Sequence, residues 1–151
     1  MAWVTITSTD LETRLSGPEL DALKTFSRAT GQGDPTNSVI ALALAEVRGY
    51  IQEADRGSDS TLIPLELKDA AIIFTIEKLA GRVSGGALVM DEARERSYDL
   101  ALQRLRDVAA GKFYISKNAA ASASSTSTEE GESLTGGNNA ILYGGDAKLD
   151  F

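Results

Sequence analysis

The sequence predicts an all-α protein: a small helical bundle of three long helices and short N-terminal helices, followed by an extended C-terminal arm. Apolar residues recur at helical spacing over most of the first 117 residues, and glycines or prolines separate these stretches. From Ala119 to Gly137 the chain is made of Ala, Ser, Thr, Glu and Gly with one leucine, which cannot bury enough apolar area to fold alone. We therefore expect a helical domain over residues 1–117, an acidic Ser/Ala/Gly-rich linker over residues 118–137 and a docking segment over residues 138–151.

Two short helices are expected before the bundle. The patterns Thr9-x-x-Glu12 and Ser16-x-x-Glu19 each place a carboxylate three residues after a hydroxyl, so that the two groups satisfy amides at a helix start. These capping boxes predict helices over residues 10–15 and 18–28.

Three long helices follow. The first is capped by Asn37 or Ser38, and its apolar face comprises Ile40, Leu44, Val47 and Ile51. The second covers residues 65–83 after Pro64 and is apolar on nearly every side, so we expect it to be the central, most buried element. Asp91 caps the third, which reaches about Ala110 with Gly111 as its C-terminal cap. Its apolar stripe is Tyr98, Ala101, Leu102, Leu105, Val108 and Ala109.

The composition excludes much enzyme chemistry. The 151 residues include no cysteine and no histidine, so there is no thiolate, disulfide, zinc finger, imidazole base or Ser-His-Asp triad. The acidic pairs Glu66/Asp69, Asp91/Glu92 and Glu129/Glu130 lie at predicted helix starts or in the tail, where they complement helix dipoles or bind water. No phosphate-binding glycine motif or EF-hand pattern occurs. We expect no enzyme activity, no cofactor and no bound metal.

Charge and hydropathy constrain location and partners. The net charge is −7, of which residues 1–117 contribute −3 (17 acidic, 14 basic) and residues 118–151 contribute −4 (5 acidic, 1 basic). This balance disfavours binding along a phosphate backbone. No stretch is long and apolar enough to span a bilayer, and the start lacks a signal peptide pattern, so we expect a protein that is cytosolic or assembled in the cytosol, without a membrane partner.

Partner-binding candidates lie at the N-terminus and in the last helix. Trp3 either covers one end of the bundle or anchors a neighbour, and both roles stay open. Four arginines alternate with acidic residues, either as a salt-bridged solvent face or as a subunit interface or a surface near DNA. They are Arg94, Arg96, Arg104 and Arg106.

The C-terminal segment supplies the other candidates. It ends in the sequence ILYGGDAKLDF, a tethered apolar piece that a helical bundle does not need for folding. Extended peptides of this kind often bind by adding a strand to an exposed sheet edge. We expect it to dock on a partner through Ile141, Leu142, Tyr143, Leu149 and Phe151.

The ordered series of helices resembles the head–tail adaptor (head-completion, or connector) proteins of tailed bacteriophages, in particular the Mu-like group. The resemblance covers residues 7–112 and is carried by packing and turn positions, not by a catalytic signature. Its markers are Tyr50, Leu62 to Pro64, Tyr98, Ala101-Leu102, Leu105-Arg106-Asp107 and Gly111-Lys112.

This resemblance implies a structural virion protein at the head–tail interface, assembled in the host cytoplasm. It implies a homo-oligomeric ring, commonly a dodecamer, that binds the portal protein and offers a platform to a tail-side connector or tail-completion protein. Genomic DNA would pass through the lumen without sequence-specific binding, and an acidic wall would let it slide. The alternative is a small helical regulatory or DNA-binding module, which would need an exposed basic recognition helix.

Overall fold

The computed structural model describes residues 2–83 and 91–118. The described chain is mostly helical, as the sequence predicts, and also contains one small sheet. Its elements in order, with η for a 3₁₀ helix, are β1 (Trp3–Val4), η1 (Ser8–Thr13), α1 (Gly17–Phe26), α2 (Thr36–Gly49), η2 (Glu53–Asp55), β2 (Ile63–Pro64), η3 (Leu65–Leu67), α3 (Lys68–Ala80) and α4 (Glu92–Ala109).

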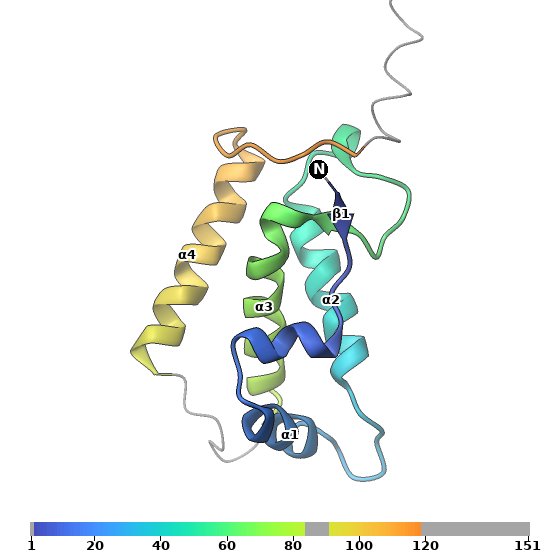
Figure 1. Ribbon diagram of the computed structural model, residues 1–151, viewed down its shortest axis with the longest axis vertical. Helices are drawn as coiled ribbons and strands as arrows, with labels where there is room; N and C mark the ends of the chain where they lie inside the picture. The colour runs from blue at the N-terminus through green and yellow to red at the C-terminus, as the bar shows by residue number, and fades with distance from the viewer. Residues whose placement is uncertain (1, 84–90, 119–151) are drawn as a thin grey trace, which may run out of the picture.

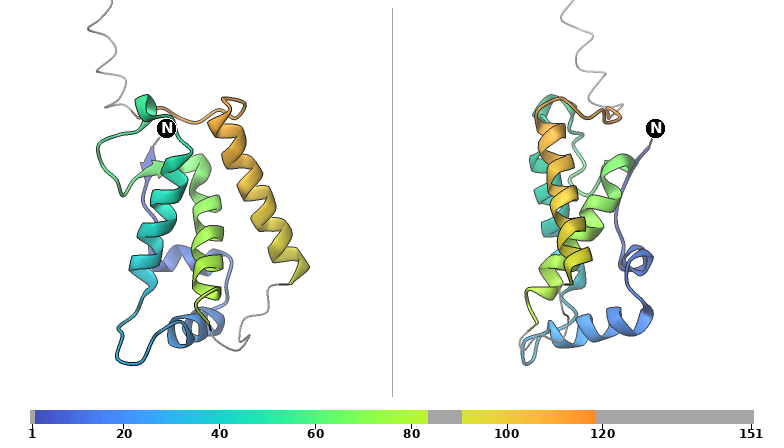
Figure 2. Two further views of the ribbon diagram at one scale, coloured as in Figure 1. Left: turned by 180° about the vertical axis from the view of Figure 1, so that it is seen from behind. Right: turned by 90° about the vertical axis from the view of Figure 1, so that its left-hand side faces the viewer.

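Helices α2, α3 and α4 form one layer with α3 in the middle (Figure 1). α3 packs against α2 on one side and against α4 on the other. The view from behind also shows α2 and α4 on opposite sides of α3 (Figure 2, left). α3 is the central and most buried helix, as its composition predicts, and its buried side chains are Ala70, Ala71, Ile72, Phe74, Thr75, Ile76 and Leu79.

The N-terminal elements cover one face and one end of the layer. η1 crosses the face of α3, and α1 lies across the end of the bundle where α3 finishes (Figures 1 and 2). Leu11 of η1 and Leu23 of α1 are fully buried, so both short helices are fixed by apolar packing. These two segments join the long helices in one hydrophobic core.

A short antiparallel sheet closes the other end of the bundle. Strand β1 pairs with β2 so that Trp3 faces Pro64 and Val4 faces Ile63. The all-α prediction did not include this pair, because the two strands are short and meet only through the tertiary fold. The sheet fixes the N-terminal segment beside the start of α3.

Several local predictions are confirmed. The Ser16 amide donates to Glu19 (3.0 Å) at the start of α1, as the capping box requires. Asp91 caps α4 by accepting a hydrogen bond from the Arg94 amide (2.8 Å). Gly111 follows the last turn of α4 with φ of +72°, a conformation that glycine adopts without strain. The predicted apolar face of the first long helix is buried throughout.

Three predicted helix starts are wrong. The first capping box is formed by Thr7 and Asp10, not by Thr9 and Glu12, and it starts a 3₁₀ helix. α2 starts at Thr36, whose amide donates to Asp34 (2.9 Å), so neither Asn37 nor Ser38 is its cap. The helix predicted over residues 65–83 begins instead with the 3₁₀ turn η3, because the preceding Pro64 is held extended in the sheet.

Helix ends also differ slightly from prediction. α1 ends at Phe26, and α3 ends at Ala80 because Gly81 follows as its C-terminal cap. Ala109 is exposed, so the buried stripe of α4 ends at Val108. No helix within the described ranges is long and apolar enough to cross a membrane. The linker from residue 119 onward and the docking segment over residues 138–151 lie outside the described residues.

Candidate functional site

The chain crosses the end of the bundle after α4, in an extended segment that we call the strap (residues 112–118) (Figure 1). The turn at Gly111 redirects the chain, and the amides of Lys112 and Phe113 donate to the Asp107 carbonyl oxygen (2.8 and 3.2 Å). The strap then runs from the α4 edge of the layer to η2, above α2. It therefore carries the chain from one edge of the bundle to the other.

Contacts from distant parts of the sequence hold the strap. The Trp3 indole Nε1 donates to the carbonyl oxygen of Ser116 (2.8 Å), whose hydroxyl Oγ donates to Glu66 Oε1 (2.5 Å). Lys117 Nζ lies 3.5 Å from Asp55 Oδ1. The Asn118 side chain fills the space beside Gly57, where a Cβ atom would lie 2.1 Å from the Asn118 Nδ2.

Glu66 is the charged group at the centre of these contacts. Burial alone would raise its pKa, but the hydrogen bonds from the Ser116 hydroxyl and from the backbone outweigh burial, so the pKa lies below its usual value. The other carboxylate oxygen, Oε2, is buried and has no hydrogen-bond partner among the described residues. The Ser116 hydroxyl therefore stabilises the charged form of Glu66, and the hydrogen bond between them attaches the strap to the start of α3.

Two arginines stabilise the loop beneath the strap. Arg48 donates to the carbonyl oxygens of Leu62 (2.5 Å) and Gly57 (2.7 Å), and its guanidinium lies 5.9 Å from the centroid of the Trp3 ring. Arg56 Nε donates to the Ile51 carbonyl oxygen (2.8 Å). These side-chain bonds satisfy backbone groups that have no helix or sheet partner, so the loop forms a defined platform.

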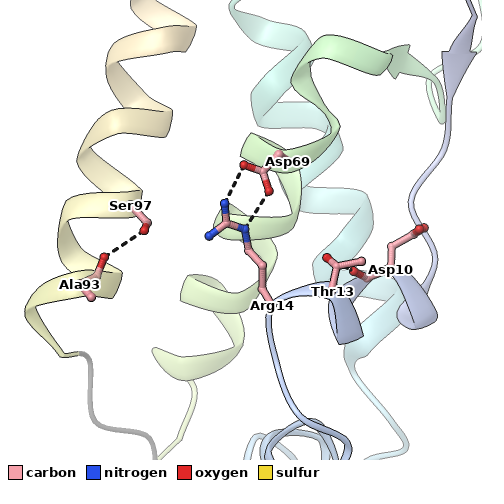
Figure 3. Close-up of polar contacts among 6 residues, drawn as sticks. All are labelled: Asp10, Thr13, Arg14, Asp69, Ala93 and Ser97. Atoms are coloured by element: carbon pink, nitrogen blue, oxygen red, sulfur yellow. Dashed lines mark hydrogen bonds and ion pairs between the residues drawn. The ribbon is translucent and has the colours of Figure 1, made fainter.

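A groove runs between α3 and α4 on the side that faces η1. Its apolar lining residues include Ile73 and Leu100, and its charged ones include Arg104. Arg14, at the end of η1, reaches across to Asp69 on α3 with two hydrogen bonds of 2.7 Å, and both side chains line the groove (Figure 3). An adjoining hollow continues along the same two helices.

The four arginines of α4 have different surroundings. Arg94 pairs with Glu19 of α1 (2.9 Å), and Arg96 pairs with Glu92 one turn earlier (2.5 Å), as their spacing predicts. Arg104 lies over the Phe113 ring at 5.6 Å from its centroid, which ties α4 to the strap. Arg106 is exposed near the end of the helix.

The two edges of the helical layer carry different surfaces. The outward residues of α2 are uncharged and mostly small, and the largest of them, Leu42, has 63% of its surface exposed. They are Asn37, Ser38, Ala41, Leu42, Ala45 and Gly49. The exposed residues of α4 are mostly charged, with Leu100 as the large apolar exception at 70% exposure. The bundle therefore exposes two unlike faces at opposite edges.

Several of the described acidic residues are engaged in structural contacts. Glu66 and Asp69 bind Ser116 and Arg14 respectively, and their pKa values are lowered, whereas a general acid needs a raised pKa. Asp59 accepts hydrogen bonds from the amide and hydroxyl of Thr61. Among the described residues no cluster of acidic side chains could hold a metal ion.

The predicted partner-binding residues fall into separate places. Trp3 is half-buried at the sheet end of the bundle, where its indole is bonded to the chain's own strap. Arg94 and Arg104 line the groove, while Arg96 and Arg106 are exposed on α4. The remaining candidates, Ile141, Leu142, Tyr143, Leu149 and Phe151, lie outside the described residues.

Residues that the sequence did not indicate complete the two sites. Ser116 and Glu66 hold the strap, and Arg14 with Asp69 form one wall of the groove. All of these contacts join positions 50 or more residues apart, so no local spacing marks them. Among the residues that hold the strap, Trp3 could be singled out from the sequence, because it is the single tryptophan and lies outside any predicted helix.

Comparisons with protein-family models, with curated proteins and with solved structures found no match. Function is therefore inferred from the helical fold, the strap and the two exposed faces.

Proposed function

We propose that the protein is a structural virion protein, a head–tail adaptor that forms a ring below the portal, extends the DNA channel and links the head to the tail. The two unlike faces at opposite edges of the α2–α3–α4 layer carry this proposal. The resemblance of residues 7–112 to phage adaptors supports it independently.

The faces favour a head-to-tail contact between identical subunits. A solvent-facing helix surface usually carries charges, yet the outward residues of α2 carry none. When one face of a subunit binds a different face of its neighbour, the assembly closes into a ring or continues as a filament. The uncharged α2 face with its exposed Leu42 differs from the charged α4 edge, as a contact between two different faces of identical subunits requires.

The charge of α4 favours this role over DNA binding. Its four arginines are balanced by Glu92, Glu95, Asp99 and Asp107, so the helix has no net charge. A helix that binds duplex DNA gains affinity by neutralising phosphates, which needs an excess of cations. In the proposed ring, DNA passes through the lumen without sequence-specific binding, and the portal and a tail-side protein bind the two ends.

Ring formation can be tested with the full-length protein. Native mass spectrometry and negative-stain imaging would be applied to the protein alone and mixed with the portal protein of the same phage. We expect a closed ring, and we expect Leu42→Arg to abolish it, because a charge would be buried in the contact. Circular dichroism should show an unchanged helical content, since Leu42 is exposed in the subunit.

Ala29→Arg provides the matched control, because Ala29 is exposed in the loop between α1 and α2 and does not belong to either face. This variant should assemble like the wild type. A protein that remains monomeric with the portal present would refute the proposal. Salt-dependent binding to duplex DNA by that monomer would support the regulatory or DNA-binding alternative instead.

A further inference from the structure

The groove between α3 and α4 is an apolar surface without a cover among the described residues. Ile73 is only half-buried, and Leu100 exposes 70% of its surface at the edge of the hollow. The adjoining hollow is lined by the half-buried Tyr98 and by the buried side chains of Leu15 and Ile76. Apolar surface of this kind, bordered by charged side chains, is typical of a binding site for a peptide or protein segment.

The charges around the groove favour an acidic occupant. The part of the groove that Ile73 and Leu100 line is bordered by two guanidinium groups, those of Arg14 after η1 and Arg104 of α4, against the one carboxylate of Asp69. This part of the border therefore has a net positive charge, although residues 1–117 as a whole carry −3. Arg94, which lines the adjoining hollow, is paired with Glu19 of α1. An acidic segment with apolar side chains would complement both the lining and the border.

One segment of this chain has that composition. Residues 141–151 contain Ile141, Leu142, Tyr143, Leu149 and Phe151, together with Asp146 and Asp150 and one lysine. We infer that residues 141–151 of each copy bind in the α3–α4 groove of the neighbouring copy. This inference rests on the ring proposed above, and it names the contact that links one subunit to the next.

The course of the strap directs the segment to the neighbour. The strap starts at the α4 edge, beside the groove of its own subunit, and carries the chain to Asp55 and Gly57 above α2. In a head-to-tail ring, the α2 edge of one subunit lies against the α4 edge of the next. The chain therefore continues from Asn118 at the edge where the neighbour's groove is closest.

The length of the connecting chain permits this contact. Residues 119–140 number 22 and can span up to about 70 Å when extended. The groove lies along α4, whose 18 residues extend over about 27 Å. The connection is thus longer than the groove and allows the segment to reach it from across a subunit boundary.

Disulfide trapping tests the contact in the full chain, which contains no natural cysteine. One preparation would carry Ser97→Cys in the groove and a second would carry Ala147→Cys in the segment, which keeps the apolar anchors intact. After the two are mixed and mildly oxidised, mass spectrometry would identify the joined peptides. We expect several-fold more disulfide at Ser97→Cys than at Thr30→Cys, an exposed control position in the loop before α2.

Charge substitutions give a second measurement. Leu100→Glu should lower the disulfide yield about threefold or more, because it places a carboxylate where an acidic segment binds. Ala109→Glu, at an exposed position of the same helix away from the groove, should leave the yield unchanged.

Three outcomes would overturn the inference. They are an equal yield at Ser97→Cys and Thr30→Cys, no effect of Leu100→Glu, and a disulfide within one chain of the double variant Ser97→Cys/Ala147→Cys at high dilution. A disulfide within one chain would show that the segment binds the groove of its own subunit. Mass measurement of the unoxidised wild type reports ring formation separately, so a ring without the disulfide would overturn this inference alone.

Discussion

Trp3 and Ser116 lie 113 positions apart, yet the Trp3 indole donates a hydrogen bond of 2.8 Å to the Ser116 carbonyl oxygen. This bond joins the first strand to the strap and places Ser116 where its hydroxyl reaches Glu66. The contact closes one end of the helical layer. It is also the point from which the chain continues toward the residues beyond Asn118.

Trp3→Phe should release the strap. The change removes the indole N–H and part of the packed ring, so we expect the free energy of unfolding to fall by about 1–2 kcal/mol. Urea denaturation followed by circular dichroism measures this, and hydrogen exchange should rise in residues 112–118. Tyr114→Phe is the control, because the Tyr114 side chain is 79% exposed and should tolerate the loss of its hydroxyl. Equal stability of the Trp3→Phe and wild-type proteins would contradict the role assigned to this bond.

Ser116→Ala should destabilise the protein more at neutral pH than in acid. The folded pKa of Glu66 lies below its ordinary value of 4.5 despite burial, so its contribution to stability is present above that value and is lost as the pH falls through the folded pKa. Without the Ser116 hydroxyl, the charged carboxylate loses a partner, at a cost of about 1–2 kcal/mol. Urea denaturation at pH 7 and below pH 4 compares the two regimes, and a penalty that is independent of pH would refute this account.

The Arg14–Asp69 pair should contribute little to stability. Both side chains are partly exposed, at 36% and 50%, so a double-mutant cycle with Arg14→Ala and Asp69→Ala should give a coupling energy of about 0.5 kcal/mol. High salt should reduce it. The hydrogen bonds from Arg14 hold the pKa of Asp69 below its ordinary value of 3.8, against the opposing effect of burial. The coupling should therefore persist above that pH and disappear as the pH falls through the folded pKa, and a coupling that is unchanged by acid would contradict it.

Gly111→Ala should destabilise the end of α4. Gly111 has φ of +72°, where an alanine Cβ is strained, so we expect a loss of about 1 kcal/mol in the free energy of unfolding. Gly17→Ala is the matched control, since both sites have open space for a Cβ but Gly17 lies in the first turn of α1 without a positive φ. The control should be neutral or slightly stabilising. Thermal unfolding of both variants tests the difference, and equal melting temperatures would argue against strain at Gly111.

Local chemistry explains which parts of the fold were predictable. Ser16 with Glu19, and Asp91 at the start of α4, act within four residues, so spacing alone indicated them correctly. Thr7 and Asp10 form the same kind of cap, but spacing alone predicts the cap at the neighbouring pair, Thr9 and Glu12. Ile6 and Leu11, on either side of this cap, are both buried. Their burial fixes where the chain turns, and the cap therefore forms at Thr7.

Long-range contacts explain what was not predictable. The pairing of Trp3 with Pro64, the bond from Ser116 to Glu66 and the Arg14–Asp69 pair each depend on how α3 packs. No periodicity in the sequence encodes such contacts. The spacing of the four arginines of α4 identifies them in the sequence. Which of them line the groove and which lie on the outer surface depends on the position of α3 beside α4.

The Trp3–Ser116 contact also determines where a reporter group can be attached. Because the strap returns to the first strand, a fluorescent protein or affinity tag fused near either Trp3 or Asn118 would occupy the same end of the bundle and crowd the strap. Residues 29–33 lie at the opposite end, in an exposed loop between α1 and α2. A short peptide epitope inserted in that loop would label the protein while the strap end stays unobstructed.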